Sequence, residues 1–184
     1  FLAAAVATGG RVWVRDWPAQ TTQPGAALPA LLELFGAQVE RVEGGLQVSG
    51  PASVEPVDVD LHHHGELTPV LAALAALAGG PSHLRGIAHL RGHETNRLAA
   101  LAHELTALGA TAVETDDGLD IAPGVLRGGV FRTYADHRMA QAGALLGVVV
   151  DGIVLDDVST TSKTFPGFER CWSGMVTGGQ AGGS

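Results

Sequence analysis

A pattern that recurs about every 70 residues constrains the fold of this chain more than any other feature of its sequence. Three segments share an Ala- and Leu-rich helix, a turn with glycine and a β-rich strand. They are FLAAAVATGGRVWVRDW from residue 1, VLAALAALAGGPSHLRGIAHL from residue 70, and QAGALLGVVVDGIVLDDV from residue 141. A period of this length is long enough for a whole supersecondary unit. The sequence therefore predicts three copies of one unit.

The first two copies also match beyond the strand, where residues 28–50 align with residues 98–124. Their Gly-Ala steps, at Gly36 and Gly109, lie 73 residues apart. Leucines at helical spacing predict a helix, and the glycine that follows them suits a left-handed C-terminal cap. Two short alternating runs around Gly118 predict a hairpin after this helix. One unit is therefore strand, helix, strand, helix, strand, strand (βαβαββ).

The three predicted units differ in completeness. The middle unit runs from Asp58 to about Pro123 and has all six elements, the first lacks its opening strand, and the third stops after a helix that begins near Phe165. Strands that alternate with helices imply right-handed crossovers and an α/β domain whose apolar helices are buried among small sheets. We expect a domain over residues 1–176, a piece of a longer protein, and a disordered Gly-rich tail over residues 177–184.

Composition excludes several classes of protein. With 46% hydrophobic and 16% charged residues the chain is globular, and its apolar runs are shorter than the roughly 20 residues that cross a bilayer. We see neither a membrane span nor a signal peptide. The net charge of −8 argues against a general nucleic-acid surface. The single cysteine, Cys171, excludes an internal disulfide framework and suits a reducing cytoplasm, where we expect the protein to be.

Chemistry is expected at the junctions from strand to helix, because free N–H groups at helix N-termini favour anions. Four junctions carry unusual residues, while the equivalent QTTQPG of the first unit is neutral: His64-Gly65-Glu66, RGHETNR (91–97), YADHR (134–138) and Ser162-Lys163-Thr164. Arg97, Arg138 and Lys163 would lie at helix starts, where the helix dipole disfavours a cation by a few tenths to about 1 kcal/mol. A small anionic substrate would explain all three, whereas a surface salt bridge would explain any one alone.

Two glutamates and several histidines lie near these junctions. Glu66 and Glu94 could exchange protons with a substrate, or could merely stabilise a helix N-terminus. Three consecutive histidines, residues 62–64, cannot all face one ion while a strand stays regular, so we predict no metal site. His93 and His137 flank the proposed anion site, and His89 and Asp136 are further candidates. Neither GxGxxG nor GxxxxGK[ST] occurs in a suitable context, so we set nucleotide binding aside.

Three motifs in the same order and spacing, RGHETNRLAAL, TYADHRMA and TTSKTFPGF, resemble the 5-enolpyruvylshikimate-3-phosphate synthase family over essentially residues 1–176. YADHRMA and SKTFP are specific to this family, and RGHETNR is also echoed in UDP-N-acetylglucosamine enolpyruvyl transferases. GELTP resembles the actinobacterial form. The resemblance implies the enolpyruvyl transferase fold, in which each of two inverse-barrel-like domains holds three βαβαββ units. This chain would be one domain of the two.

The same resemblance implies a 3-phosphoshikimate 1-carboxyvinyltransferase of the shikimate pathway, which serves chorismate and aromatic amino acid biosynthesis. Such an enzyme transfers the enolpyruvyl group of phosphoenolpyruvate to the 5-hydroxyl of shikimate 3-phosphate and releases phosphate. It uses no metal or other cofactor, and the full-length protein is expected to be a monomer. The family's first-domain Lys, Ser and Arg ligands are absent from this chain, so we expect the isolated chain to be inactive.

Residue roles carry over by motif. Glu66 would be the base at the shikimate hydroxyl, and Glu94 would protonate the phosphoenolpyruvate methylene. His93 would contact the shikimate phosphate, where lysine is common, and three cations would clamp phosphoenolpyruvate: Arg97, Arg138 and Lys163. Asn96 replaces the family's usual Asp, which we expect to weaken the orientation of Arg97. The alternatives are a UDP-N-acetylglucosamine enolpyruvyl transferase and a non-catalytic anion-binding module of the same fold.

Overall fold

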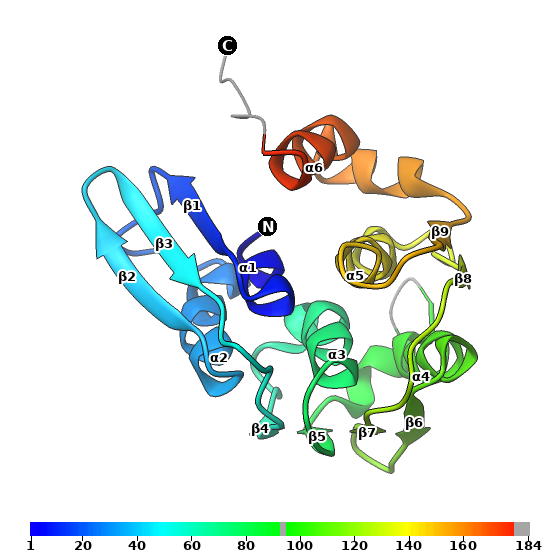
Figure 1. Cartoon of the computed structure of the whole chain (residues 1–184). Helices are drawn as coiled ribbons and strands as arrows, with labels where there is room; N and C mark the ends of the chain where they lie inside the picture. Colours follow the sequence, from blue (N-terminus) through cyan, green and yellow to red (C-terminus); the bar gives the residue numbers. More distant parts are fainter. Residues whose placement is uncertain (93–94, 179–184) are drawn as a thin grey trace.

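The computed structural model describes residues 1–92 and 95–178, and its middle part contains the complete predicted unit (Figure 1). In this unit β4 and β5 are parallel, and β5, β7 and β6 follow as antiparallel neighbours, so the sheet order is β4-β5-β7-β6. Gly109 ends the second helix with a φ of 112°, as the sequence predicts for a left-handed cap. The elements are β4 (Asp58–Asp60), η2 (Gly65–Leu67), α3 (Thr68–Ala76), β5 (Ser82–Arg85), η3 (Ala88–Gly92), α4 (Arg97–Leu108), β6 (Thr111–Glu114) and β7 (Leu119–Ala122).

The first unit repeats the later part of this arrangement. Its three-stranded antiparallel sheet has the order β1-β3-β2, which corresponds to β5-β7-β6 of the middle unit. The elements described for this unit begin with α1, the counterpart of α3. Its elements are α1 (Leu2–Thr8), β1 (Arg11–Arg15), η1 (Pro24–Ala27), α2 (Leu28–Leu34), β2 (Gln38–Val42) and β3 (Gly45–Ser49).

The third unit repeats the opening part instead. Its two strands pair in parallel, as β4 and β5 do, and its last helix begins three residues after the predicted Phe165. The elements are β8 (Gly129–Phe131), α5 (His137–Leu146), β9 (Ile153–Leu155), η4 (Val158–Lys163) and α6 (Phe168–Val176). The predicted repeat of βαβαββ units is therefore confirmed.

The first helices of the three units, α1, α3 and α5, contact one another at the centre of the molecule (Figure 1). Eight of the nine residues of α3 are buried, because an apolar, Ala-rich helix has no polar face to turn outward. Gly143 brings α5 against its own sheet, since a Cβ there would lie 2.6 Å from Phe131 and closer still to Leu155. The burial of these helices, predicted from their composition, is confirmed.

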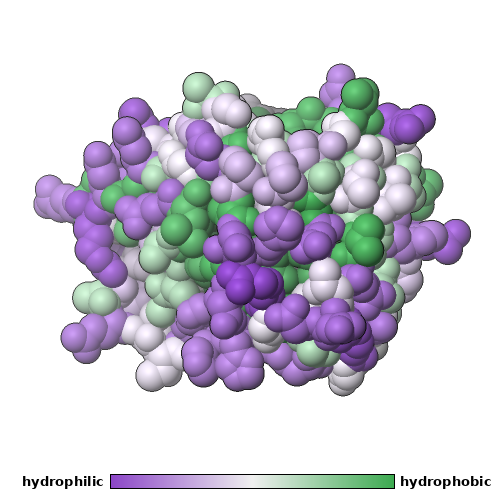
Figure 2. Space-filling model, turned by 90° about the horizontal axis from the view of Figure 1, so that it is seen from below, coloured by the Kyte–Doolittle hydropathy of each residue, from purple (hydrophilic) through white to green (hydrophobic). Residues whose placement is uncertain are grey.

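The outer face of the middle sheet alternates as a half-buried sheet should. On β5, Ser82 and Leu84 are buried, whereas His83 and Arg85 are exposed and pair with Asp120 and Asp58. Seen from below, this side of the molecule is largely hydrophilic, with hydrophobic patches between the polar side chains (Figure 2). In the part of the chain that the structure describes, no helix is long and apolar enough to cross a membrane.

The consecutive histidines do not lie on a strand, so that part of the prediction is wrong. β4 ends at Asp60, whose carboxylate accepts a hydrogen bond from the His62 N–H at 2.8 Å. The His64 N–H donates to the Leu61 carbonyl at 2.8 Å, which closes a turn. An Asp side chain that bonds the backbone two residues on favours a turn over a strand. The predicted tail lies partly outside the described residues, at 179–184, and stays a prediction.

Candidate active site

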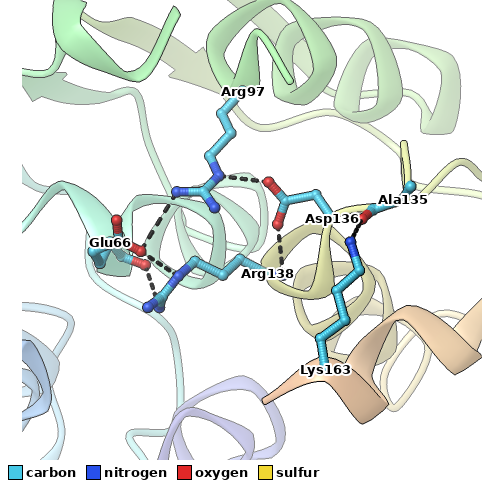
Figure 3. A network of polar contacts seen from close by, with 6 residues as sticks. All are labelled: Glu66, Arg97, Ala135, Asp136, Arg138 and Lys163. Carbon is cyan, nitrogen blue, oxygen red and sulfur yellow. Dashed lines mark hydrogen bonds and ion pairs between the residues drawn. The ribbon is translucent and has the colours of Figure 1, made fainter. Parts of the chain in front are cut away.

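Three of the predicted junctions converge because α3 and α5 pack side by side and α4 packs against α3. Glu66 lies in η2, directly before α3, and Arg97 is the first residue of α4. Asp136 is the N-cap of α5, and Arg138 is its second residue. The four side chains point toward one another from two different repeats (Figure 3). Packing of the repeats therefore assembles a charged cluster that no single repeat contains.

Arg97 lies in the interior of this cluster. Its side chain is 2% exposed, and its Nε donates to Asp136 Oδ2 at 2.7 Å, while Asp136 is fully buried. Its Nη1 lies 3.5 Å from Glu66 Oε2. A guanidinium buried to this degree requires carboxylate partners, because an unpaired buried charge costs several kcal/mol. Arg97 is thus held in place by Asp136.

Asp136 holds the start of α5 as well as Arg97. Its Oδ1 accepts a hydrogen bond from the Arg138 N–H at 2.8 Å, which makes it a helix N-cap. Burial alone would raise the pKa of Asp136, but the hydrogen bonds from Arg97 and from the Arg138 N–H outweigh it and lower the pKa. Asp136 therefore stays ionised as the counter-charge of Arg97.

Arg138 joins the same cluster from α5. Its Nη1 donates to the Glu66 carbonyl oxygen at 2.8 Å, and its Nε forms an ion pair with Glu66 Oε2. The side chains of Arg138 and Glu66 are 28% and 33% exposed, so both can be reached from solvent. They line a cavity of about 450 Å³ together with His137 and apolar residues of α1, α3, α5 and α6. The arrangement offers an accessible cation and an accessible carboxylate in direct contact.

Lys163 approaches from the other side of the loop that leads into α5. It ends η4, is exposed, and donates from Nζ to the Ala135 carbonyl oxygen at 3.0 Å (Figure 3). Arg97 and Arg138 thus lie in the first turns of α4 and α5, as predicted, whereas Lys163 is the last residue of η4 and α6 begins only at Phe168, so its predicted place at a helix start is wrong. All three cations contact Glu66 or the residues around Asp136. Arginine forks and an ammonium group in such a set suit the oxygens of a carboxylate or phosphate.

The other predicted residues are placed as follows. His93 and Glu94 lie outside the described residues, so their roles stay predictions. His137 lines the cavity, and His89 lies in η3, where its ring approaches Gly65 and lies 6.1 Å from that of His62. Within residues 1–92 and 95–178, no three His, Cys, Asp or Glu side chains gather closely enough to hold a metal ion.

Two residues have roles that the sequence did not indicate. Asn96 accepts a hydrogen bond from the Ala99 N–H at 3.2 Å and caps α4, while Asp136 orients the neighbouring Arg97. Glu104 is 2% exposed and accepts a hydrogen bond from the Tyr134 hydroxyl at 2.7 Å. Its position, three residues after the buried Leu101, gave a signal, since a charged residue on an apolar helix face needs a partner.

Comparison with known proteins decides the family. The sequence model of EPSP synthase (3-phosphoshikimate 1-carboxyvinyltransferase) matches residues 1–172. This chain belongs to the EPSP synthase family. It is 58% identical over 176 residues to the 3-phosphoshikimate 1-carboxyvinyltransferase of Kocuria rhizophila, an alignment that covers 96% of this chain and 40% of that protein. The resemblance inferred from the three motifs is confirmed, and the chain spans less than half of this EPSP synthase relative.

Solved structures show the same fold at low sequence identity. An EPSP synthase from Acinetobacter baumannii superposes with a TM-score of 0.81 at 24% identity, over 95% of this chain and 44% of that one. The enolpyruvyl transferase NikO from Streptomyces tendae gives a TM-score of 0.72 at 21% identity, over 92% of this chain and 40% of that one. The enolpyruvyl transferase fold that the family resemblance implied is therefore confirmed.

Proposed function

We propose that this chain supplies part of the active site of a 3-phosphoshikimate 1-carboxyvinyltransferase. In the whole protein, the enolpyruvyl group of phosphoenolpyruvate would pass to the 5-hydroxyl of shikimate 3-phosphate with release of phosphate. The observation that carries the proposal is the accessible Glu66 carboxylate in contact with Arg138, beside the buried Arg97 and Asp136. Membership of the EPSP synthase family supports the choice of substrates.

The cations would bind phosphoenolpyruvate. Arg138 and Lys163 are accessible, and each already contacts an oxygen, of Glu66 and of Ala135 respectively. An incoming carboxylate or phosphate would compete with Glu66 for the guanidinium of Arg138, which would turn the carboxylate toward the second substrate. Arg97 is already fixed by Asp136, so its charge is pre-organised and requires little reorganisation when the substrate binds.

The proposed reaction proceeds by addition and elimination. The 5-hydroxyl gives its proton to Glu66 and forms a C–O bond to C2 of phosphoenolpyruvate, while an acid protonates the methylene carbon. The conjugate base of that acid then takes a proton from the resulting methyl group, which restores the double bond as the C–O bond to phosphate breaks. Glu94, outside the described residues, is our proposed acid, and His93 our proposed contact to the shikimate phosphate. The cations stabilise the negative charge that the phosphate carries away.

We infer a monomeric, cytoplasmic enzyme that takes only these two small-molecule substrates. The fold alone does not select shikimate 3-phosphate, because it is shared with other enolpyruvyl transferases. YADHRMA and SKTFP favour the shikimate substrate over UDP-N-acetylglucosamine.

The test is a chimera in which this chain replaces the matching segment of the Kocuria rhizophila protein. Phosphate release is measured with phosphoenolpyruvate and either shikimate 3-phosphate or UDP-N-acetylglucosamine. We expect turnover with the first only, and its loss in Glu66→Gln and Lys163→Met. Arg85→Met serves as a control, because Arg85 lies on the outer face of β5 in an exposed pair with Asp58.

Three outcomes would count against the proposal. Turnover with the UDP-sugar would favour the other enolpyruvyl transferase. A folded chimera that binds phosphoenolpyruvate without turnover would favour the anion-binding module. Full activity in Glu66→Gln would show that another group takes the hydroxyl proton.

A further inference from the structure

Glu104 is a buried carboxylate that the proposed reaction does not use. It lies on α4 and is 2% exposed. One of its oxygens accepts the Tyr134 hydroxyl hydrogen at 2.7 Å, and the other accepts the Arg132 N–H at 2.9 Å. Both partners belong to the loop between β8 and α5, some thirty residues further along the chain. A buried carboxylate is costly unless such bonds satisfy it, so its position is tied to that of the loop.

The loop that Glu104 holds has an unfavourable backbone conformation. Tyr134 and Ala135 have φ values of 54° and 55°, in the left-handed region that residues other than glycine rarely adopt. Each such residue carries a steric cost, because its Cβ lies too close to the following carbonyl oxygen. The Thr133 N–H between the two Glu104 contacts donates to Asp156 Oδ1 at 2.8 Å. Strained backbone persists only where surrounding contacts over-determine it. Here the buried carboxylate of Glu104 and the exposed carboxylate of Asp156 supply those contacts.

The strained residues lie directly beside the cationic groups of the site. The Ala135 carbonyl receives the hydrogen bond from Lys163 Nζ at 3.0 Å. Asp136, the next residue, pairs with Arg97 at 2.7 Å and caps the helix that carries Arg138. A change of the backbone at 134–135 would therefore displace the groups that hold all three cations.

We propose that Glu104 is a positioning residue, which holds the Arg132–Asp136 loop in its left-handed conformation and thereby sets Lys163, Arg97 and Arg138 at the distances that a bound anion requires. The kinetic consequence rests on the proposed function, but the structural consequence does not. Glu104 itself contacts neither Glu66 nor the three cations in any hydrogen bond or ion pair among the described residues.

The phenol of Tyr134 gives a direct readout of the contact. Burial and then the hydrogen bond to Glu104 raise the pKa of Tyr134 to about 12. It is the one tyrosine of the 184-residue sequence, so ultraviolet titration of the phenolate reports this residue alone. In Glu104→Leu the apparent pKa should fall toward the ordinary value of 10.0. Glu114→Gln, at the exposed pair with Arg91, should leave it unchanged.

The second measurement follows Arg97 in the nitrogen-15-labelled chain. In the wild type, its buried Nε–H is bonded to Asp136 and should exchange slowly with solvent. Glu104→Leu should accelerate this exchange at least tenfold, and Tyr134→Phe should do so by less, because the Arg132 contact remains. Glu104→Gln keeps an acceptor for one loop partner and should restore most of the protection. A folded Glu104→Leu or Tyr134→Phe variant with wild-type Arg97 exchange would overturn the proposal.

The third measurement uses the chimera. If the loop positions the cations, Glu104→Leu should raise KM for phosphoenolpyruvate by on the order of tenfold to a hundredfold. The KM for shikimate 3-phosphate should change much less, and Glu104→Gln should be intermediate. A fall in activity without a selective change of KM would indicate a merely structural residue and would overturn the kinetic claim. An inactive wild-type chimera would instead refute the proposed function, while the Arg97 exchange would still decide the positioning role.

Discussion

Replacing Asp136 with Asn tests whether the buried pair at the centre of the site stabilises the fold. The substitution keeps the shape of the side chain and an oxygen that can cap α5, since Asn and Asp cap helices about equally well. It removes the negative charge that faces Arg97 at 2.7 Å. Arg97, at 2% exposure, would then keep Glu66 as a carboxylate contact, at 3.5 Å.

The expected loss follows from the burial of both partners. Breaking a buried ion pair by removing one charge costs about 3–5 kcal/mol, because the other charge stays buried. Glu66 compensates in part, which points to the lower end of this range, about 3 kcal/mol. In a chain of this length 1 kcal/mol corresponds to roughly 2–4 °C, so the midpoint should fall by about 6–12 °C. Asp136→Ala should lose about 1 kcal/mol more, with the cap.

The assay is thermal and urea unfolding of the whole chain, followed by circular dichroism. Asp157→Asn is the matched control. Asp157 caps η4 by the same contact to the N–H two residues on, at 2.9 Å, but it is exposed. Its replacement should change the free energy of unfolding by less than about 0.5 kcal/mol.

A cycle with Arg97→Met completes the experiment. Each single variant leaves one buried charge, whereas the double variant with Asp136→Asn leaves neither of them. We therefore expect the double variant to be more stable than the sum of the two losses predicts, by about 1–3 kcal/mol. Equal effects of Asp136→Asn and Asp157→Asn, together with additivity in the cycle, would refute the buried pair.

Three further predictions concern packing, capping and pH. Gly143→Ala should lower the urea midpoint and reduce the free energy of unfolding by about 1–3 kcal/mol, because the new Cβ would overlap Phe131 and Leu155. Gly147→Ala should be tolerated, because a Cβ there meets nothing closer than 3.5 Å. Asn96→Ala should cost about 1 kcal/mol in thermal unfolding, and Asn96→Asp, which restores the family's usual residue, should change stability little. The pKa of Asp136 lies below its ordinary value of 3.8. The ionised carboxylate therefore contributes its full stabilisation above pH 3.8, and this stabilisation is lost as the pH falls below that value. Acid unfolding should show this loss in the wild type and lack it in Asp136→Asn.

The sequence predicted the elements of the fold because the signals for them are local. Alternation, helical spacing, Gly109 and the turn around Gly118 each act over a few residues. These signals recur in successive units, so each copy supported the secondary structure predicted for the other. The structure confirms the six elements of the middle unit and their partial repeats before and after it. The three histidines were misassigned because one local contact, from His62 to Asp60, outweighed the pattern of the strand.

The contacts of the site, unlike the signals for helices and strands, join residues that are far apart in the sequence. Glu66 and Arg97 are 31 residues apart, Arg97 and Asp136 are 39 apart, and Glu66 and Arg138 are 72 apart. The motifs predicted which residues gather at the junctions. They did not indicate that Arg97 is buried, that Asp136 orients it, or that Glu104 holds the loop before it. These facts depend on how α3, α4 and α5 pack, which no short pattern encodes.

The distribution of charge among the repeats explains why the cluster needs more than one of them. The middle unit supplies Glu66 and Arg97, and the third supplies Asp136, Arg138 and Lys163, while the equivalent junction of the first, QTTQPG, is neutral. Each arginine makes an ion pair with a carboxylate of the other repeat. These two ion pairs form only when the middle and third repeats are both in place. The packing of α3 on α5 and the assembly of the site therefore depend on each other. A substitution that loosens this packing should therefore reduce anion binding even where it touches none of the charged residues.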